Sequence, residues 1–268
     1  MRHFSTIMIK RLSIILCLLC FVGLTYGQRR AVMTKPRQTP DSVTAMVWTC
    51  ANFSYQWPIG DLGTFYKGNF SIGTGFTYKT ATHWTFDVHF NYCFGANLRD
   101  TTLLDNLKTS KGDIIDGNGL KATLYLEGQY WHVGAGLGRI IPVSKTYLNS
   151  GIWIHAGLGY IRHKIHFTDV DNQVPQIGGD YRKGYDRRSS GFFLSQFIGY
   201  VHIGKSRVAS FYGGVEIMEM WTKPDRNYDF NLGPTKDLKN KFSGLIGLKI
   251  GWIVPLYTQK HQMTYYYN

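Results

Sequence analysis

Hydrophobic and polar side chains alternate along most of the chain from Met46 onward. The pattern is clearest between His83 and Phe94, where large apolar residues occupy every second position. One face of this stretch carries Trp84, Phe86, Val88, Phe90, Tyr92 and Phe94, and the other carries His83, Thr85, Asp87, His89, Asn91 and Cys93. A period of two is the period of a β-strand whose two faces meet different surroundings.

Similar stretches follow one another and predict eight strands. They cover 46–57, 66–79, 83–95, 120–140, 151–168, 191–204, 208–222 and 241–257. The second strand puts Tyr66 on its apolar face. The fourth changes phase near Gly128, which predicts a β-bulge or bend there. Both faces of the sixth strand are apolar, one with Phe193, Phe197 and Val201 and the other with Leu194, Ile198 and Tyr200. The pattern therefore does not say which of its faces points outward.

The apolar faces carry aromatic residues near both ends, and the opposite faces are rich in glycine and small polar residues. The connections at 80–82, 141–150 and 205–207 are short, 58–65 is intermediate, and 96–119, 169–190 and 223–240 are long. These features predict an all-β fold, an eight-stranded antiparallel up-and-down transmembrane β-barrel over 46–257. A secreted soluble β-protein is the alternative. An eight-stranded barrel has an interior that side chains can fill, so we expect no open pore.

The first segment, 1–27, has the pattern of a cleaved signal peptide. Arg2, Lys10 and Arg11 precede a short apolar run, and Gly27 precedes the expected cleavage site. A membrane-anchoring helix is the alternative, but the run is shorter than the roughly 20 residues a spanning helix needs. We expect periplasmic tails at 28–45 and 258–268, on either side of the barrel.

The net charge is +13, and removal of 1–27 takes away three basic residues and no acidic one, so the mature chain stays basic. A basic exported protein can meet outer-membrane lipid, lipopolysaccharide phosphates or acidic protein partners in the envelope. Nucleic acid is not an expected partner outside the cytoplasm. Only Cys50 and Cys93 remain after cleavage, on non-adjacent predicted strands, so we expect free buried thiols.

Four ionisable residues fall on predicted inward faces: Asp87, His89, Glu216 and Lys249. Charges in a narrow interior must be paired or hydrogen-bonded. Glu216 and Lys249 lie on neighbouring predicted strands, where they could meet. We expect a structural polar network in the lumen, with proton transfer or ligand binding as the alternative.

The loop Gly178–Arg188 has the most distinctive composition of the long connections. It holds four basic residues and two tyrosines, namely Tyr181, Arg182, Lys183, Tyr185, Arg187 and Arg188. Arginine and tyrosine are frequent in protein interfaces, and arginine binds phosphate well. The segment therefore predicts a contact with a protein partner or with lipopolysaccharide, or else an ordinary solvated basic loop.

Other motifs favour neither catalysis nor a cofactor. His163 and His166 should face opposite sides of a strand, so they cannot chelate one metal without a bend. The segment Asp113–Gly119 has oxygen ligands and glycines but lacks EF-hand spacing, which favours a polar turn over a calcium loop. No serine stands beside a histidine on an outward face in a way that predicts a nucleophile. We expect no enzyme, no cofactor and no metal.

Three motifs carry a resemblance to a known group of proteins. They are the Gly27-Gln28 junction, the segment from Tyr55 to Leu62, and the segment from Gly251 to Tyr257. With these, the chain resembles the small outer-membrane β-barrel proteins of Bacteroidota, including the PorT-like type, and more distantly the OmpX/OmpA-type barrels. The resemblance implies an accessory subunit of an envelope machine, in protein secretion or barrel assembly. A free-standing structural or adhesive barrel and a lipid-modifying enzyme are the alternatives. The stretch from Lys249 to Leu256 also resembles a terminal barrel-insertion signal.

Overall fold

A computed structural model describes residues 43–98, 103–145, 147–169, 174–204, 209–230, 233–234 and 241–256. The predicted signal peptide and the tail at 258–268 lie outside these residues. Eight long strands form the body of the fold: β1 (Met46–Gly60), β2 (Asn69–Lys79), β3 (Trp84–Asn97), β4 (Leu124–Pro142), β5 (Gly151–Asp169), β6 (Ser189–His202), β7 (Phe211–Pro224) and β10 (Lys241–Leu256).

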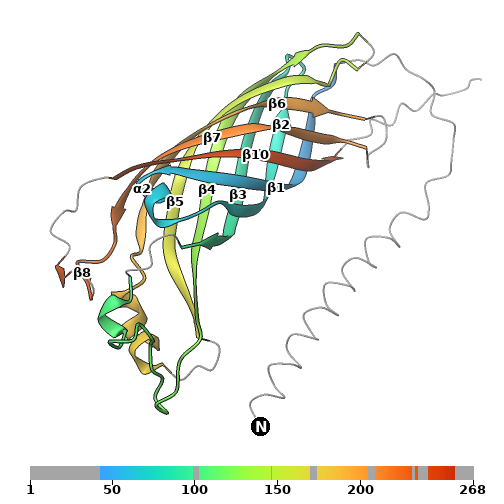
Figure 1. The fold of residues 1–268 in the computed structure, drawn as a ribbon. Helices are drawn as coiled ribbons and strands as arrows, with labels where there is room; N and C mark the ends of the chain where they lie inside the picture. The colour runs from blue at the N-terminus through green and yellow to red at the C-terminus, as the bar shows by residue number, and fades with distance from the viewer. Residues whose placement is uncertain are drawn as a thin grey trace, which may run out of the picture. The chain divides into compact units, whose positions relative to one another are not determined.

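The eight strands close into one antiparallel up-and-down barrel, as predicted. Each strand pairs with its neighbours in the chain, and β10 closes the ring by pairing with β1. Figure 1 shows the closed ring, with β1 and β10 side by side. Closure pairs the backbone of every long strand on both edges, which is the condition for placing a sheet in an apolar medium.

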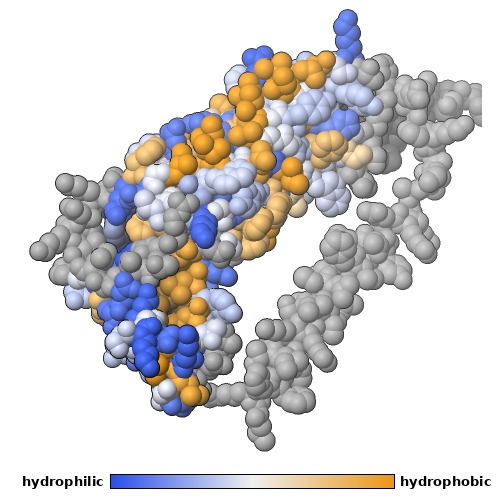
Figure 2. Space-filling view, viewed as in Figure 1, coloured by the Kyte–Doolittle hydropathy of each residue, from blue (hydrophilic) through white to orange (hydrophobic). Residues whose placement is uncertain are grey.

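The outer wall of the barrel is apolar, because alternate side chains of every long strand point outward. Outward residues on β1, β3 and β10 include Phe53, Trp57, Phe86, Phe90, Leu248 and Trp252, all exposed. In Figure 2 the hydrophobic residues gather over the strands. On β6, the strand left open by the sequence, Leu194, Ile198 and Tyr200 point outward, and Phe193, Phe197 and Val201 are buried inside.

Aromatic side chains form a row on the outer wall near one end of the barrel. The row runs across five strands through Trp131, Tyr160, Phe192, Trp221 and Phe242. The Arg162 guanidinium covers the rings of Trp131 and Tyr160. At the other end the Arg139 guanidinium lies 5.4 Å from the Trp84 ring centre. Arginine over an aromatic ring suits a boundary between an apolar layer and water.

The interior is filled by two apolar clusters with a polar layer between them. One cluster lies toward the long loops and includes Ile161, Phe193, Met218, Met220 and Leu245; the other includes Trp48, Trp153, Phe197, Val201 and Ile253. The lumen is thus less polar than the sequence predicts. The reason is that inward positions need only be out of lipid, and large side chains fill the ends of the narrow ring.

Two local predictions need correction, although the predicted irregularity near Gly128 is present. The extra residue of the bulge lies in β3, because Cys93 pairs with Tyr130 whereas Ala96 pairs with Gly128. Gly95 supplies the left-handed backbone there, with φ of 73°. Tyr66 does not face outward, since the helix α2 (Asp61–Phe65) turns the chain and leaves Tyr66 buried before β2 begins.

The long connections gather at one end of the barrel. They carry α2, the 3-10 turns η1 (Asp105–Leu107), η2 (Pro175–Ile177) and η3 (Tyr181–Gly184), and the paired segments β8 (Tyr228–Asp229) and β9 (Gly233–Pro234). We call this end, described residues 61–68, 98, 103–123, 174–188, 225–230 and 233–234, the loop end. No helix among the described residues is long and apolar enough to cross a membrane.

Candidate functional site

The polar layer of the lumen brings the four predicted residues into two groups. The Lys249 ammonium lies 2.7 Å from the Glu216 carboxylate, across the β7–β10 pair. Asp87 lies 2.8 Å from His89 and 2.5 Å from His155, which the sequence did not assign to this layer. All of these side chains are largely buried. Each charge therefore has a partner, as an interior of low polarity requires.

The six predicted loop residues do not form one exposed patch. Tyr185 is buried, and its hydroxyl accepts a hydrogen bond from Asn106. Arg182 donates to the Ile177 carbonyl. Tyr181 and Lys183 stay exposed, Lys183 beside Asp180 on the same turn. The hydrogen bond from Lys183 lowers the pKa of the Asp180 carboxyl.

Arg187 and Arg188 turn toward an acidic segment of another loop, Asp225–Asp229. Arg187 lies 3.0 Å from Asp229, and Arg188 lies 2.9 Å from Asp225. Arg226 reciprocates by binding Asp186, and this hydrogen bond raises the pKa of Arg226. The basic loop is therefore tied to its neighbour by ion pairs. The sequence analysis did not single out the segment Asp225–Asp229. Its only signal was two aspartates close to an arginine and a tyrosine.

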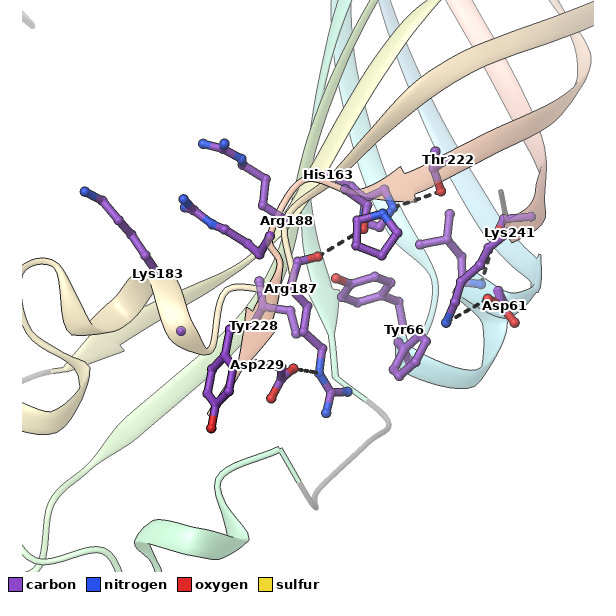
Figure 3. Close-up of a pocket in the computed structure, with 18 residues that line it drawn as sticks. Asp61, Tyr66, His163, Lys183, Arg187, Arg188, Thr222, Tyr228, Asp229 and Lys241 are labelled. Carbon is purple, nitrogen blue, oxygen red and sulfur yellow. Dashed lines mark hydrogen bonds and ion pairs between the residues drawn. The ribbon is translucent and has the colours of Figure 1, made fainter. Parts of the chain in front are cut away.

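These loops, together with α2 and the tops of β5, β7 and β10, line a cavity of about 330 Å³. Figure 3 shows Tyr66 and His163 within it, between the Arg187–Asp229 pair and the Lys241–Asp61 pair. The apolar part of the lining comes from Leu62, Phe65, Ile165, Pro224 and the rings of Tyr66 and Tyr228. We call this cavity the mouth pocket. A concave apolar site with a few polar groups is the usual form of a small-molecule site.

Tyr66 is the most informative group of the mouth pocket. Its side chain is 4% exposed. Figure 3 shows its hydroxyl pointing toward the space between Arg187 and His163. Burial raises the pKa of this hydroxyl, against the opposing charge of Arg187, so it remains a protonated donor. Desolvation and the charge of Arg187 are the influences on this hydroxyl, with no hydrogen bond from a described residue among them, and it faces the pocket.

The possible calcium loop is a polar turn. The Asp116 carboxylate accepts hydrogen bonds from the backbone N–H groups of Asn118 and Leu120, both at 2.8 Å. Asp113 lies 2.6 Å from the Lys121 ammonium. One oxygen of each carboxylate thus already binds a protein group, as in a polar turn. The free thiols were predicted correctly: Cys50 and Cys93 are both buried and unpaired in the described chain.

No protein family and no curated protein sequence matches the chain. Among solved structures it is similar to the attachment invasion locus protein Ail of Yersinia pestis, with 11% identity and a TM-score of 0.41, over 78% of this chain and 98% of that one. It is also similar to Neisserial surface protein A, with 12% identity and a TM-score of 0.43, over 77% of this chain and 96% of that one. The similarity to the outer membrane protein OprG of Pseudomonas aeruginosa has 13% identity and a TM-score of 0.41, over 82% of this chain and 100% of that one. Similarities of this size carry no argument about function, and the PorT-like assignment stays a prediction.

Proposed function

We propose that the chain is a non-enzymatic integral β-barrel of a bacterial outer membrane. The observation that carries this proposal is the apolar outer wall of the closed ring, bounded by aromatic side chains. Soluble proteins rarely expose contiguous apolar patches above a few hundred Å². A wall of this kind around a whole barrel is stable only against lipid, where each buried Å² of apolar surface contributes about 25 cal/mol.

The orientation follows from the connections. Outer-membrane barrels have short periplasmic turns and long external loops. The long connections all lie at the loop end. The first strand begins at Met46 and the last strand ends at Leu256, and both of these residues lie at the opposite end of the barrel. The loop end and its mouth pocket would then face the outside of the cell. The predicted tails at 28–45 and 258–268 would lie in the periplasm.

Because side chains fill the lumen, we expect the protein to act through its surfaces. Two apolar clusters close the ring above and below the polar layer, so we expect no conductance. We propose that the barrel acts as an accessory subunit of an envelope machine, in protein secretion or barrel assembly. The ion pairs that hold the long loops together support this role, because they give partners a surface of defined shape.

A free-standing barrel that binds a ligand outside the cell is the second candidate function. The mouth pocket favours it, since a subunit that only binds proteins needs no cavity of ligand size. Crosslinking in whole cells followed by purification and mass spectrometry separates the two. Recovery of the same envelope proteins in every preparation supports the subunit, whereas recovery of the barrel alone supports the free-standing protein.

Membrane placement has its own test. The protein should fractionate with outer membranes, need detergent for extraction, and migrate faster on a gel when unboiled. Recovery from the aqueous fraction without detergent would refute the proposal. N-terminal sequencing of the extracted protein tests cleavage before Gln28. The mass of lipid A with and without the gene tests the remaining alternative, a lipid-modifying enzyme.

A further inference from the structure

The mouth pocket is rich in charged side chains but carries no spare charge. Five lysine and arginine residues line it, and each lies near a carboxylate. The pairs are Lys183–Asp180, Arg187–Asp229, Arg188–Asp225, Arg226–Asp186 and Lys241–Asp61, at 2.5 to 3.4 Å. A charged ligand would have to take a partner from one of these pairs. A neutral ligand can add hydrogen bonds to them without separating any.

The uncharged polar groups of the pocket require a ligand that both donates and accepts. The Tyr66 hydroxyl can do both, and it has no partner among the described residues. Thr222 and Ser243 add two further hydroxyls to the lining. The Arg187–Asp229 and Lys241–Asp61 pairs offer N–H donors on one side and carboxylate oxygens on the other, because both members of each pair line the pocket. Ligand hydroxyl groups fit this mixed set, because each of them donates one hydrogen bond and accepts others.

The apolar groups of the pocket lie beside these polar groups. Phe65 and the rings of Tyr66 and Tyr228 give flat surfaces, and Pro224 adds a compact one. A ligand that suits the pocket therefore has apolar C–H faces and a rim of hydroxyl groups. The volume of about 330 Å³ lies at the lower end of the range for ligand sites, which suits one or two rings.

We propose that the mouth pocket binds a neutral sugar unit. Its rings contact the C–H faces of the sugar, and the Tyr66 hydroxyl, with the Arg187–Asp229 and Lys241–Asp61 pairs, binds the hydroxyl groups. The inference rests on the proposed function in one respect, which is that the loop end faces the outside of the cell, where surface glycans are available. The pocket itself lies on loops and strand tops and does not depend on lipid for its chemistry.

The test uses the full mature protein, refolded in detergent. Methyl glycosides of glucose, galactose, mannose and N-acetylglucosamine are the neutral probes, and glucuronate and glucose 6-phosphate are the anionic ones. Ligand-observed NMR and calorimetry should detect binding of at least one neutral glycoside. The protein should bind that glycoside more tightly than either anion. Binding of no neutral glycoside, or tighter binding of an anion, overturns the inference.

Variants connect the binding to the pocket. Tyr66→Phe removes only the unpartnered hydroxyl and should weaken binding about 3- to 10-fold, the value of one hydrogen bond. Tyr181→Phe, on an exposed tyrosine outside the pocket, is the matched control and should leave binding unchanged. Equal binding by Tyr66→Phe and the parent protein would overturn the assignment.

A second variant tests the charge balance. Asp61→Asn leaves Lys241 without its carboxylate and should raise the affinity for glucuronate several-fold relative to the neutral glycoside. An unchanged preference would refute the argument from paired charges. The gel shift on boiling, measured on the same preparations, separates the two proposals: a heat-modifiable barrel that binds no sugar keeps the membrane proposal and loses this one.

Discussion

The lumen and the loop end both contain ion pairs, yet the pairs have different roles. In the lumen, Lys249–Glu216 lies between two apolar clusters, away from water. At the loop end, the Lys241–Asp61 pair keeps 51% and 43% of its two side chains exposed to water. The comparison teaches that a lumen charge depends on one partner, whereas a loop charge can exchange its partner for solvent. Variants of one pair in each region test this difference, and variants of the outer wall and of the bulge compare its size with two other effects.

The largest effect is expected from loss of one lumen partner. Lys249→Met leaves the Glu216 carboxylate buried without a cation, which costs about 3–5 kcal/mol of unfolding free energy. Urea titration of the protein in lipid vesicles measures it. The double variant Lys249→Met with Glu216→Leu should recover most of this loss, because no charge remains buried. Two single variants whose effects simply add would contradict the pairing.

The outer wall provides the second largest effect. Leu158→Arg places a cation near the middle of the apolar wall, at a cost of about 2–4 kcal/mol in lipid. Leu120→Arg in the loop end is the matched control, since both leucines are 66% exposed. The control should change the unfolding free energy by less than about 0.5 kcal/mol. Equal effects at the two sites would mean that water, and not lipid, surrounds Leu158.

The bulge in β3 gives an intermediate effect. Gly95→Ala should cost about 1–2 kcal/mol, because φ is 73° and the left-handed backbone disfavours a side chain. Space is not the reason, since the nearest atom to the new Cβ lies at 3.5 Å. Gly213→Ala is the control, with its nearest contact at 3.6 Å and no positive φ. A loss of stability as large in the control would refute the backbone explanation.

The smallest effects are expected at the loop end. Lys241→Ala should lower stability by about 1 kcal/mol at most, because water solvates the released Asp61, whose side chain is 43% exposed. Lys183→Ala, at the Lys183–Asp180 pair on the surface, should change the unfolding free energy by less than about 0.5 kcal/mol. The same urea titration measures both variants. An effect of Lys241→Ala as large as that of Lys249→Met would erase the distinction between the two regions.

The candidate site was only half visible in the sequence. The unusual composition of Tyr181–Arg188 marked the basic loop, but a free basic surface was the wrong picture for Arg187 and Arg188. Their partners, Asp225 and Asp229, lie about forty positions along the chain. The two loops become neighbours only because β6 and β7 are adjacent in the ring. The mouth pocket likewise needs α2, β5, β7 and β10 together.

The sequence by itself determined the strands and the direction of most side chains. A residue's neighbours at two positions before and after share its face, so Phe53 or Leu248 could be assigned to the outer wall from local pattern alone. The tertiary structure decided which face points inward where the local pattern makes both faces of a strand equally apolar. Both faces of β6 are apolar, and only ring closure places Phe193 inside and Leu194 outside. Tyr66 follows the strand period, yet α2 turns it inward, because the local turn geometry overrides alternation at the end of a strand.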